Sequence, residues 1–160
     1  MKLSQLLSAD RIILDMKAQE HWAAITELVD HLVDRGGLPK ELRAPLLAAL
    51  KAREDLVSTG IGAGVAIPHA FSDELTEVVA VFGRSKVGLD FEALDHSPVH
   101  FIVLFVVPRI DYHLHLRTLA AIAKMFTKGE VLRQLATAET NDDILAILAA
   151  KPSRVAEPGA

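Results

Sequence analysis

Runs of apolar residues with the pattern of β-strands recur at four places along the chain. The longest, 99–107, is apolar at nearly every position, which is typical of a strand covered on both faces. The segments 11–15, 65–67 and 78–82 are shorter and rich in β-branched residues. This pattern predicts a sheet with 99–107 as a central strand that ends at Pro108.

A helical pattern follows the first predicted strand. Its apolar residues recur at spacings of three and four: Trp22, Ile25, Leu28, Val29, Leu32 and Val33. The pair Gly36-Gly37 is typical of a helix C-terminus. His21 and His31 belong to this helix, and because no facing carboxylate is evident in the sequence we predict that both lie at the surface.

Further helices are predicted after this one. The segment 38–56 is expected to be helical, with its regular part starting near Pro45. Asp111 is a predicted N-cap for a helix with an apolar stripe, and two short helices are expected over 130–136 and 141–149. The order of strands and helices predicts an α/β fold with the sheet covered on both faces.

Length and composition restrict the function. With 160 residues, half of them apolar, the chain fits a single domain over residues 1–150, followed by a flexible tail over 151–160. The net charge of −4 argues against a nucleic-acid partner. There is no cysteine and no apolar run long enough to span a membrane, so we expect a cytoplasmic protein without membrane insertion.

The segment 58–70 carries the candidate chemistry. Gly60, Gly62 and Gly64 leave backbone N–H groups accessible to an anion, and Thr59 adds a hydroxyl. The strand 65–67 is expected to end at Pro68, with a polar turn over 70–77. His69 therefore lies at a strand end, where a neutral imidazole can act as a nucleophile. The alternative is a structural histidine in a turn.

Two further side chains are candidates for the same site. Arg53 lies on the apolar side of the helix 38–56, where its guanidinium either binds a phosphoryl group or complements the helix dipole. His115 borders the apolar stripe after Asp111, at a helix N-terminus that favours a neutral ring able to donate to an anion. Its alternative role is to pack at the start of the helix.

The spacing of these residues resembles a known family. Glu54, then Ile61-Gly62, then Val65-Ala66-Ile67-Pro68-His69-Ala70 is similar, position by position, to the phosphorylation-site pattern of fructose/mannitol-type IIA proteins of the bacterial phosphotransferase system, which include the nitrogen-regulatory IIA proteins. The resemblance covers about residues 3 to 149. It implies a three-layer α/β/α sandwich with a mixed sheet.

The resemblance also implies a mechanism. His69 would accept a phosphoryl group from the carrier protein HPr or a similar donor, without a metal or organic cofactor. Arg53 stands where the family has an arginine, sixteen residues before the phosphorylated histidine. Counting to Leu119-Ala120, His115 matches the family's second histidine better than His113 does. Arg53 and His115 would then stabilise the transferred group, assisted by Thr59 and the glycine backbone.

Several functions remain open at this level. A transport IIA protein passes its phosphoryl group to a sugar-specific IIB component, whereas a regulatory one, as in nitrogen regulation, changes its protein partner with its phosphorylation state. A third possibility is a binding module without phosphoryl transfer. Zinc bound by His69, His113 and His115 is a fourth, although the expected carboxylate or cysteine ligands are not evident.

Overall fold

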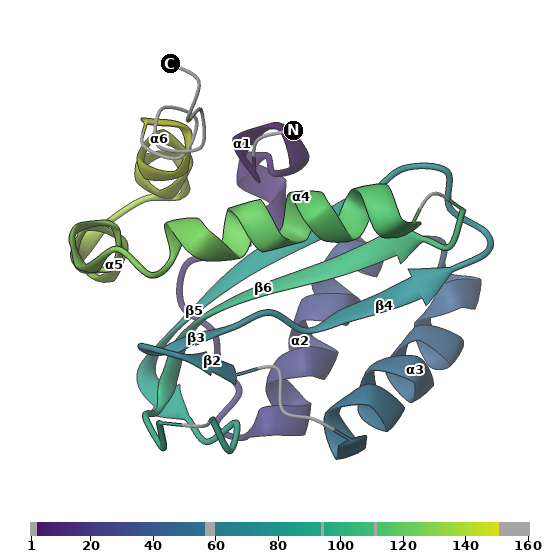
Figure 1. Cartoon of the computed structure of the whole chain (residues 1–160), viewed down its shortest axis with the longest axis horizontal. Helices are drawn as coiled ribbons and strands as arrows, with labels where there is room; N and C mark the ends of the chain where they lie inside the picture. The colour runs from purple at the N-terminus through teal and green to yellow at the C-terminus, as the bar shows by residue number, and fades with distance from the viewer. Residues whose placement is uncertain (1–2, 57–59, 94, 111, 151–160) are drawn as a thin grey trace.

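The computed structural model describes residues 3–56, 60–93, 95–110 and 112–150. A sheet of six strands lies between two layers of helices (Figure 1). Helices α2 and α3 cover one face, and α4 crosses the other. The predicted three-layer α/β/α architecture with a mixed sheet is confirmed.

The central strand of the sheet is the one with the most apolar sequence. The strands are β1 (Ile12–Ile13), β2 (Gly60–Gly62), β3 (Val65–Ala66), β4 (His69–Ser72), β5 (Val79–Leu89) and β6 (Val99–Pro108). The strand order is β1-β5-β6-β3-β2, and β4 also pairs with β6. β6 runs antiparallel to β5 and parallel to β3 and β4. The prediction of a central strand over 99–107 is confirmed.

The strand over 65–67 ends before Pro68 as predicted, but pairing with β6 resumes at His69. Proline cannot donate a backbone hydrogen bond, but its carbonyl still accepts one, and the Phe105 N–H donates to the Pro68 carbonyl at 3.0 Å. The chain therefore continues along β6 as β4, and the predicted turn over 70–77 begins only after Ser72. Pro68 interrupts the strand, and His69 starts its second half.

The predicted helices are present, together with a short one that the sequence pattern did not predict. The helices are α1 (Leu3–Leu6), α2 (His21–Asp34), α3 (Arg43–Leu56), α4 (Tyr112–Met125), α5 (Gly129–Thr137) and α6 (Asn141–Ala150). α3 begins at Arg43, which puts Pro45 in the first turn, where no N–H partner is needed. Gly36, with a φ of 75°, follows the end of α2. The predicted N-cap Asp111 lies outside the described residues.

Side chains of β6 alternate between two hydrophobic cores. Phe101, Val103, Phe105 and Val107 belong to a core shared with α4 and α6, whereas Ile102, Leu104 and Val106 belong to a core shared with α2 and α3. This alternation follows from the two-residue period of a strand. A strand with apolar residues at both sets of positions can only be buried in the middle layer.

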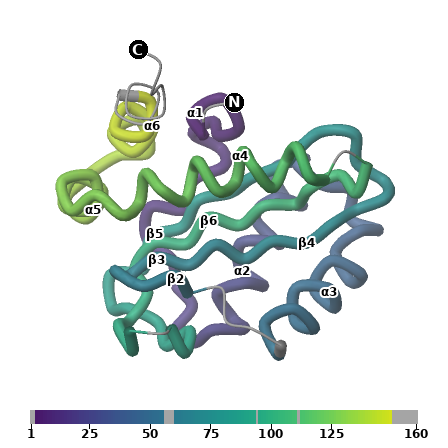
Figure 2. Tube along the Cα trace, in the orientation of Figure 1, coloured from purple at the N-terminus to yellow at the C-terminus, as the bar shows by residue number. Residues whose placement is uncertain are grey.

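The two ends of the described chain lie side by side, with α1 packed against α6 (Figure 2). α6 is capped by Thr140: its Oγ1 accepts from the Asp143 N–H at 3.0 Å, and Asp143 Oδ2 accepts from the Thr140 N–H at 3.2 Å. The predicted tail over 151–160 lies outside the described residues. Within the described part of the chain, no helix is long and apolar enough to cross a membrane.

Candidate functional site

His69 is the first residue of β4 and is half-buried. In the parallel pair with β6, His69 lies opposite Phe105 and Phe71 lies opposite Val107. Directly paired residues of adjacent strands point to the same face of a sheet, so His69 and Phe71 both point to the face covered by α4. Phe71 accordingly packs against the core on that side.

A backbone carbonyl fixes the tautomer of His69. Its Nδ1 lies 3.2 Å from the carbonyl oxygen of Ile67. Because a carbonyl oxygen only accepts hydrogen bonds, Nδ1 must carry the proton and donate. In the neutral ring, Nε2 then holds the free lone pair. The sequence did not indicate this contact, since it depends on the backbone turn at Pro68.

The surroundings of His69 favour its neutral form. Burial lowers the pKa of His69 below its ordinary value, the bond to the Ile67 carbonyl opposes that shift, and the charge of Arg53 adds to the lowering while that of Glu54 opposes it. Near neutral pH the ring is therefore an uncharged acceptor. Arg53 and Glu54 both lie close enough to His69 for their charges to act on it.

The last turn of α3 brings Arg53 and Glu54 toward His69, since α3 packs against β4. Arg53 is exposed, whereas Glu54 is buried. Glu54 Oε2 lies 3.0 Å from Nε2 of His21, the first residue of α2. The structure thus supports the predicted proximity of Arg53 to His69 and adds a buried carboxylate behind it.

The prediction that His21 lies at the surface is wrong. The ring of His21 stacks on Trp22 with centroids 4.7 Å apart and lies against Phe91 at 3.9 Å. Its side chain is only 17% exposed. Glu54 on α3 supplies the facing carboxylate that the prediction lacked. This contact joins α2 and α3, and the residue pattern of either helix alone does not reveal it.

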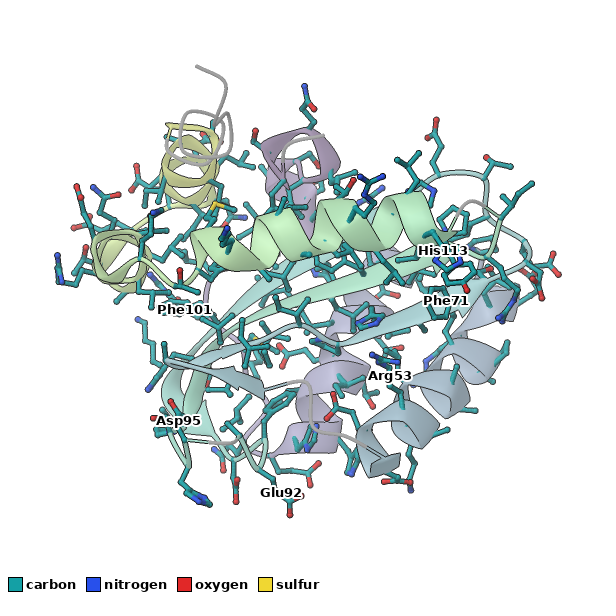
Figure 3. The ribbon with its side chains drawn as sticks, viewed as in Figure 1. Arg53, Phe71, Glu92, Asp95, Phe101 and His113 are labelled. Carbon is teal, nitrogen blue, oxygen red and sulfur yellow. The ribbon has the colours of Figure 1, made fainter. Side chains whose placement is uncertain are left out.

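A chain of aromatic contacts joins His69 to α4. The His69 ring meets Phe71 edge-to-face at 6.1 Å, and Phe71 meets Tyr112 edge-to-face at 5.6 Å. The Arg109 guanidinium lies over Phe71 at 5.8 Å. Figure 3 shows Phe71 and His113 together where α4 begins, with Arg53 on the side of α3. Sequence reasoning did not include Phe71 or Tyr112 in the site.

The two histidines of α4 have different surroundings. His113 is exposed and lies against Tyr112, with ring centroids 3.9 Å apart. His115 is half-buried. Because α4 already begins at Tyr112, residues two apart do not share a helix face, and at most one of these rings points to His69. The assignment of His115 stays a prediction.

The glycine segment forms a hairpin, β2 and β3, at the edge of the sheet. Gly60 pairs with Ala66 and Gly62 with Val65, so the hairpin runs back along β3, away from His69. A Cβ atom at Gly62 would lie 3.1 Å from Asp95, and the Ala63 N–H donates to Asp95 at 2.9 Å. In Figure 3, Asp95 lies at the opposite end of the sheet from Phe71.

This arrangement bears on the predicted phosphate-binding residues. Of the hairpin glycines, Gly60 pairs nearest to His69 along β3, and Gly64 lies against the Pro98 carbonyl at the turn. Thr59, which precedes Gly60, lies outside the described residues. Phosphate binding by Thr59, Gly60, Gly62 and Gly64 stays a prediction.

Metal binding has no support among the described residues. Within these ranges, no group of three or more histidine, aspartate or glutamate side chains is arranged to hold a metal ion. His69, His113 and His115 thus do not form a zinc site in that part of the chain.

Comparison with known proteins agrees with the geometry. Residues 5–151 match the family described as the phosphoenolpyruvate-dependent sugar phosphotransferase system, EIIA 2. The chain belongs to this family. A fructose-specific EIIABC component of Bacillus subtilis is 34% identical over 148 residues, which are 92% of this chain and 23% of that protein. The chain thus spans about a quarter of the length of this EIIABC protein.

Other IIA relatives have about the same length as this chain. A fructose-specific EIIA component of Haloferax volcanii is 31% identical over 147 residues, covering 92% of this chain and 94% of that protein. The crystal structure of the nitrogen regulatory protein IIA-Ntr from Neisseria meningitidis has a TM-score of 0.83 and 30% identity, covering 91% of this chain and 98% of that one. Proteins named for sugar transport and for nitrogen regulation are thus both similar to this IIA chain.

Proposed function

We propose that this chain is a phosphoryl carrier of the phosphoenolpyruvate-dependent phosphotransferase system and accepts the phosphoryl group on Nε2 of His69. The observation that carries the proposal is the hydrogen bond from Nδ1 to the Ile67 carbonyl, which leaves Nε2 as the nucleophilic nitrogen. The lowered pKa of His69, set first by burial, keeps that nitrogen unprotonated near neutral pH. Family membership supports the same chemistry.

The donor in this proposal is a phosphohistidine on an HPr-like carrier protein. The Nε2 lone pair of His69 forms a bond to phosphorus while the donor's N–P bond breaks and its imidazole leaves with the electron pair. The proton on Nδ1 stays in place, and the Ile67 carbonyl stabilises the positive charge that develops on the ring. Because the donor is already activated, catalysis needs only alignment and charge stabilisation, without a cofactor.

Arg53 and His115 are the groups proposed to stabilise the transferred phosphoryl oxygens. Arg53 offers a planar, permanently charged fork and is exposed enough to reach an incoming group. His115 would donate from a neutral ring on α4. Thr59 and the backbone of Gly60, Gly62 and Gly64 are proposed as lesser contributors.

The proposal is tested by incubation with phosphoenolpyruvate, enzyme I and HPr, followed by a search for acid-labile, base-stable phosphate. We expect wild-type chain to be labelled and His69→Ala to carry no label. His96→Ala, which changes an exposed histidine in the connection between β5 and β6, is the matched control and should label normally. Label retained in folded His69→Ala would refute the assignment of the acceptor.

The downstream acceptor separates transport from regulation. The similarity to fructose-specific EIIA components favours transfer to a IIB component, and that to IIA-Ntr favours a regulated protein partner. Addition of candidate IIB domains to labelled chain should discharge the label only in the transport case. A chain that is never labelled would instead be a binding module. In either carrier role we propose a cytoplasmic location.

A further inference from the structure

Glu54 is a charged side chain almost without access to water. Its side chain is 1% exposed, in the last turn of α3. A buried carboxylate is costly unless a positive or hydrogen-bonding group compensates for it. Nε2 of His21 lies 3.0 Å from Glu54 Oε2, an ion-pair distance without the geometry of a hydrogen bond. The pair therefore ties the end of α3 to the start of α2.

The imidazole of His21 is itself held in place. Trp22 stacks on it with a 3° angle between the ring planes, and Phe91 lies against it at 3.9 Å. A cavity of about 460 Å³ adjoins the pair, lined by Gln19, Glu20, His21, Trp22, Glu54, Asp55, Asp90 and Glu92. The cavity therefore lies beside the pair, although the Glu54 side chain and the Nε2 atom of His21 are themselves buried.

Glu54 directly follows Arg53 in α3, and the two carry opposite charges beside the acceptor. After burial, which lowers the pKa of His69 most, Arg53 lowers it further and Glu54 raises it. The two charges thus partly cancel at the imidazole. Of Arg53 and Glu54, it is Glu54 that contacts His21.

Other titratable groups lie on the elements near β4. His113 and His115 lie on α4, the helix over the face of the sheet to which His69 points. Beyond Phe71, Arg109 and Asp73 form an ion pair at 2.8 Å whose charges offset one another. Neither Arg109 nor Asp73 is among the groups whose charge acts on His69.

We infer that Glu54, held by His21, is a positioning residue for the phosphoryl acceptor. It anchors the turn of α3 that carries Arg53, and its negative charge acts on the His69 imidazole against the charge of Arg53. This inference rests on the proposed function of His69. A purely structural role for the pair would change stability without changing the titration of His69.

The test compares Glu54→Gln with Asp55→Asn. The first removes the buried charge with little change of shape, and the second removes an exposed charge from the next position of the same turn. The titration midpoint of His69 is read by NMR from its imidazole carbon, without any donor protein. Removing the negative charge of Glu54 makes imidazolium less favourable, so we expect the midpoint to fall by roughly 0.3 to 1 pH unit.

The rate of labelling should report the same shift. In Glu54→Gln the acidic limb of the pH–rate profile should move to lower pH by the same amount as the NMR midpoint. In Asp55→Asn both should stay at the wild-type values. An equal shift in the two variants would mean that only net charge matters and would overturn the inference.

A second variant keeps the test decisive if Glu54→Gln does not fold. His21→Phe retains the ring packing on Trp22 and Phe91 but removes the partner nitrogen, so the Glu54 carboxylate should turn to the water of the cavity. We expect the His69 midpoint to fall in this variant too, and the double variant to show no larger shift than Glu54→Gln alone.

The results separate this inference from the proposed function. If wild-type chain is not labelled, the proposed function fails. If it is labelled and the His69 midpoint moves in neither Glu54→Gln nor His21→Phe, the inference fails while the function stands.

Discussion

At His69, partial burial and one hydrogen bond together leave Nε2 unprotonated, as the proposed nucleophile requires. Burial disfavours the imidazolium and lowers the pKa of His69 below its ordinary value of 6.5, while the Ile67 carbonyl selects the nitrogen that stays free. The same shift has a cost at low pH. Because the unfolded chain binds the proton more readily, the stability that this group contributes is lost as the pH falls below about 6.5.

Arg53 should depend on its shape as well as on its charge. In Arg53→Lys the positive charge is kept but the planar fork that can bind two phosphoryl oxygens is lost. We expect the rate of labelling from phosphorylated HPr to fall by about tenfold or more. Arg43→Lys, at the other end of α3, is the matched control and should leave the rate unchanged. A wild-type rate in Arg53→Lys would return Arg53 to a dipole-capping role.

The two histidines of α4 provide their own control. His115→Leu should slow labelling by about tenfold or more, since the half-buried ring on the acceptor's face of the sheet would be replaced by a side chain without an N–H donor. His113→Leu should change the rate less than twofold, roughly the effect of an exposed surface change. Initial rates under one set of conditions decide between them. The reverse order would assign the donor role to His113.

At the scale of the elements, a single buried side chain joins β5 to the C-terminal helices. Arg84, with a side chain 5% exposed, donates to the carbonyls of Leu135 at 3.0 Å and Ala138 at 2.6 Å, at the end of α5. It also donates to the Leu14 carbonyl at 3.0 Å. Arginine suits this position because its guanidinium presents several donors in fixed directions.

Loss of this connection should be costly. In Arg84→Met the carbonyls of α5 and Leu14 lose a charged donor in a buried place, so we expect the free energy of unfolding to fall by about 3 kcal/mol. Lys86→Met removes an exposed cation that pairs with the same Asp15 and should cost at most about 0.5 kcal/mol. Urea denaturation measures both. Equal losses would show that Asp15, and not the carbonyls, accounts for the effect.

Elements with a clear periodicity were predictable from the sequence, and those decided by pairing were not. The stripe of α2 and the Gly36-Gly37 stop follow from local spacing alone. By contrast, β4 forms because its residues after Pro68 pair with β6. β5 extends to Leu89 because β6 pairs with it beyond the predicted end at residue 82. The local pattern of polar and apolar residues does not show which segments pair with β6.

At the scale of the whole molecule, the sheet between two helical layers follows from β6. Because its odd-numbered and even-numbered residues enter different cores, the strand requires cover on both sides, and the sequence pattern expressed this directly. The strand order depends on contacts far apart in the chain and came only with the structure. The candidate site shows the same division: the sequence singled out His69 and Arg53, whose roles stay predictions, whereas the contacts of Ile67, Phe71 and the His21–Glu54 pair require the assembled layers.

The stacking of Trp22 on His21 places a fluorescent side chain beside the Glu54 pair. Trp22 is the only tryptophan in the chain, so all indole fluorescence comes from beside the Glu54 pair. Tryptophan emission thus offers an optical readout of the His21 environment without any added label.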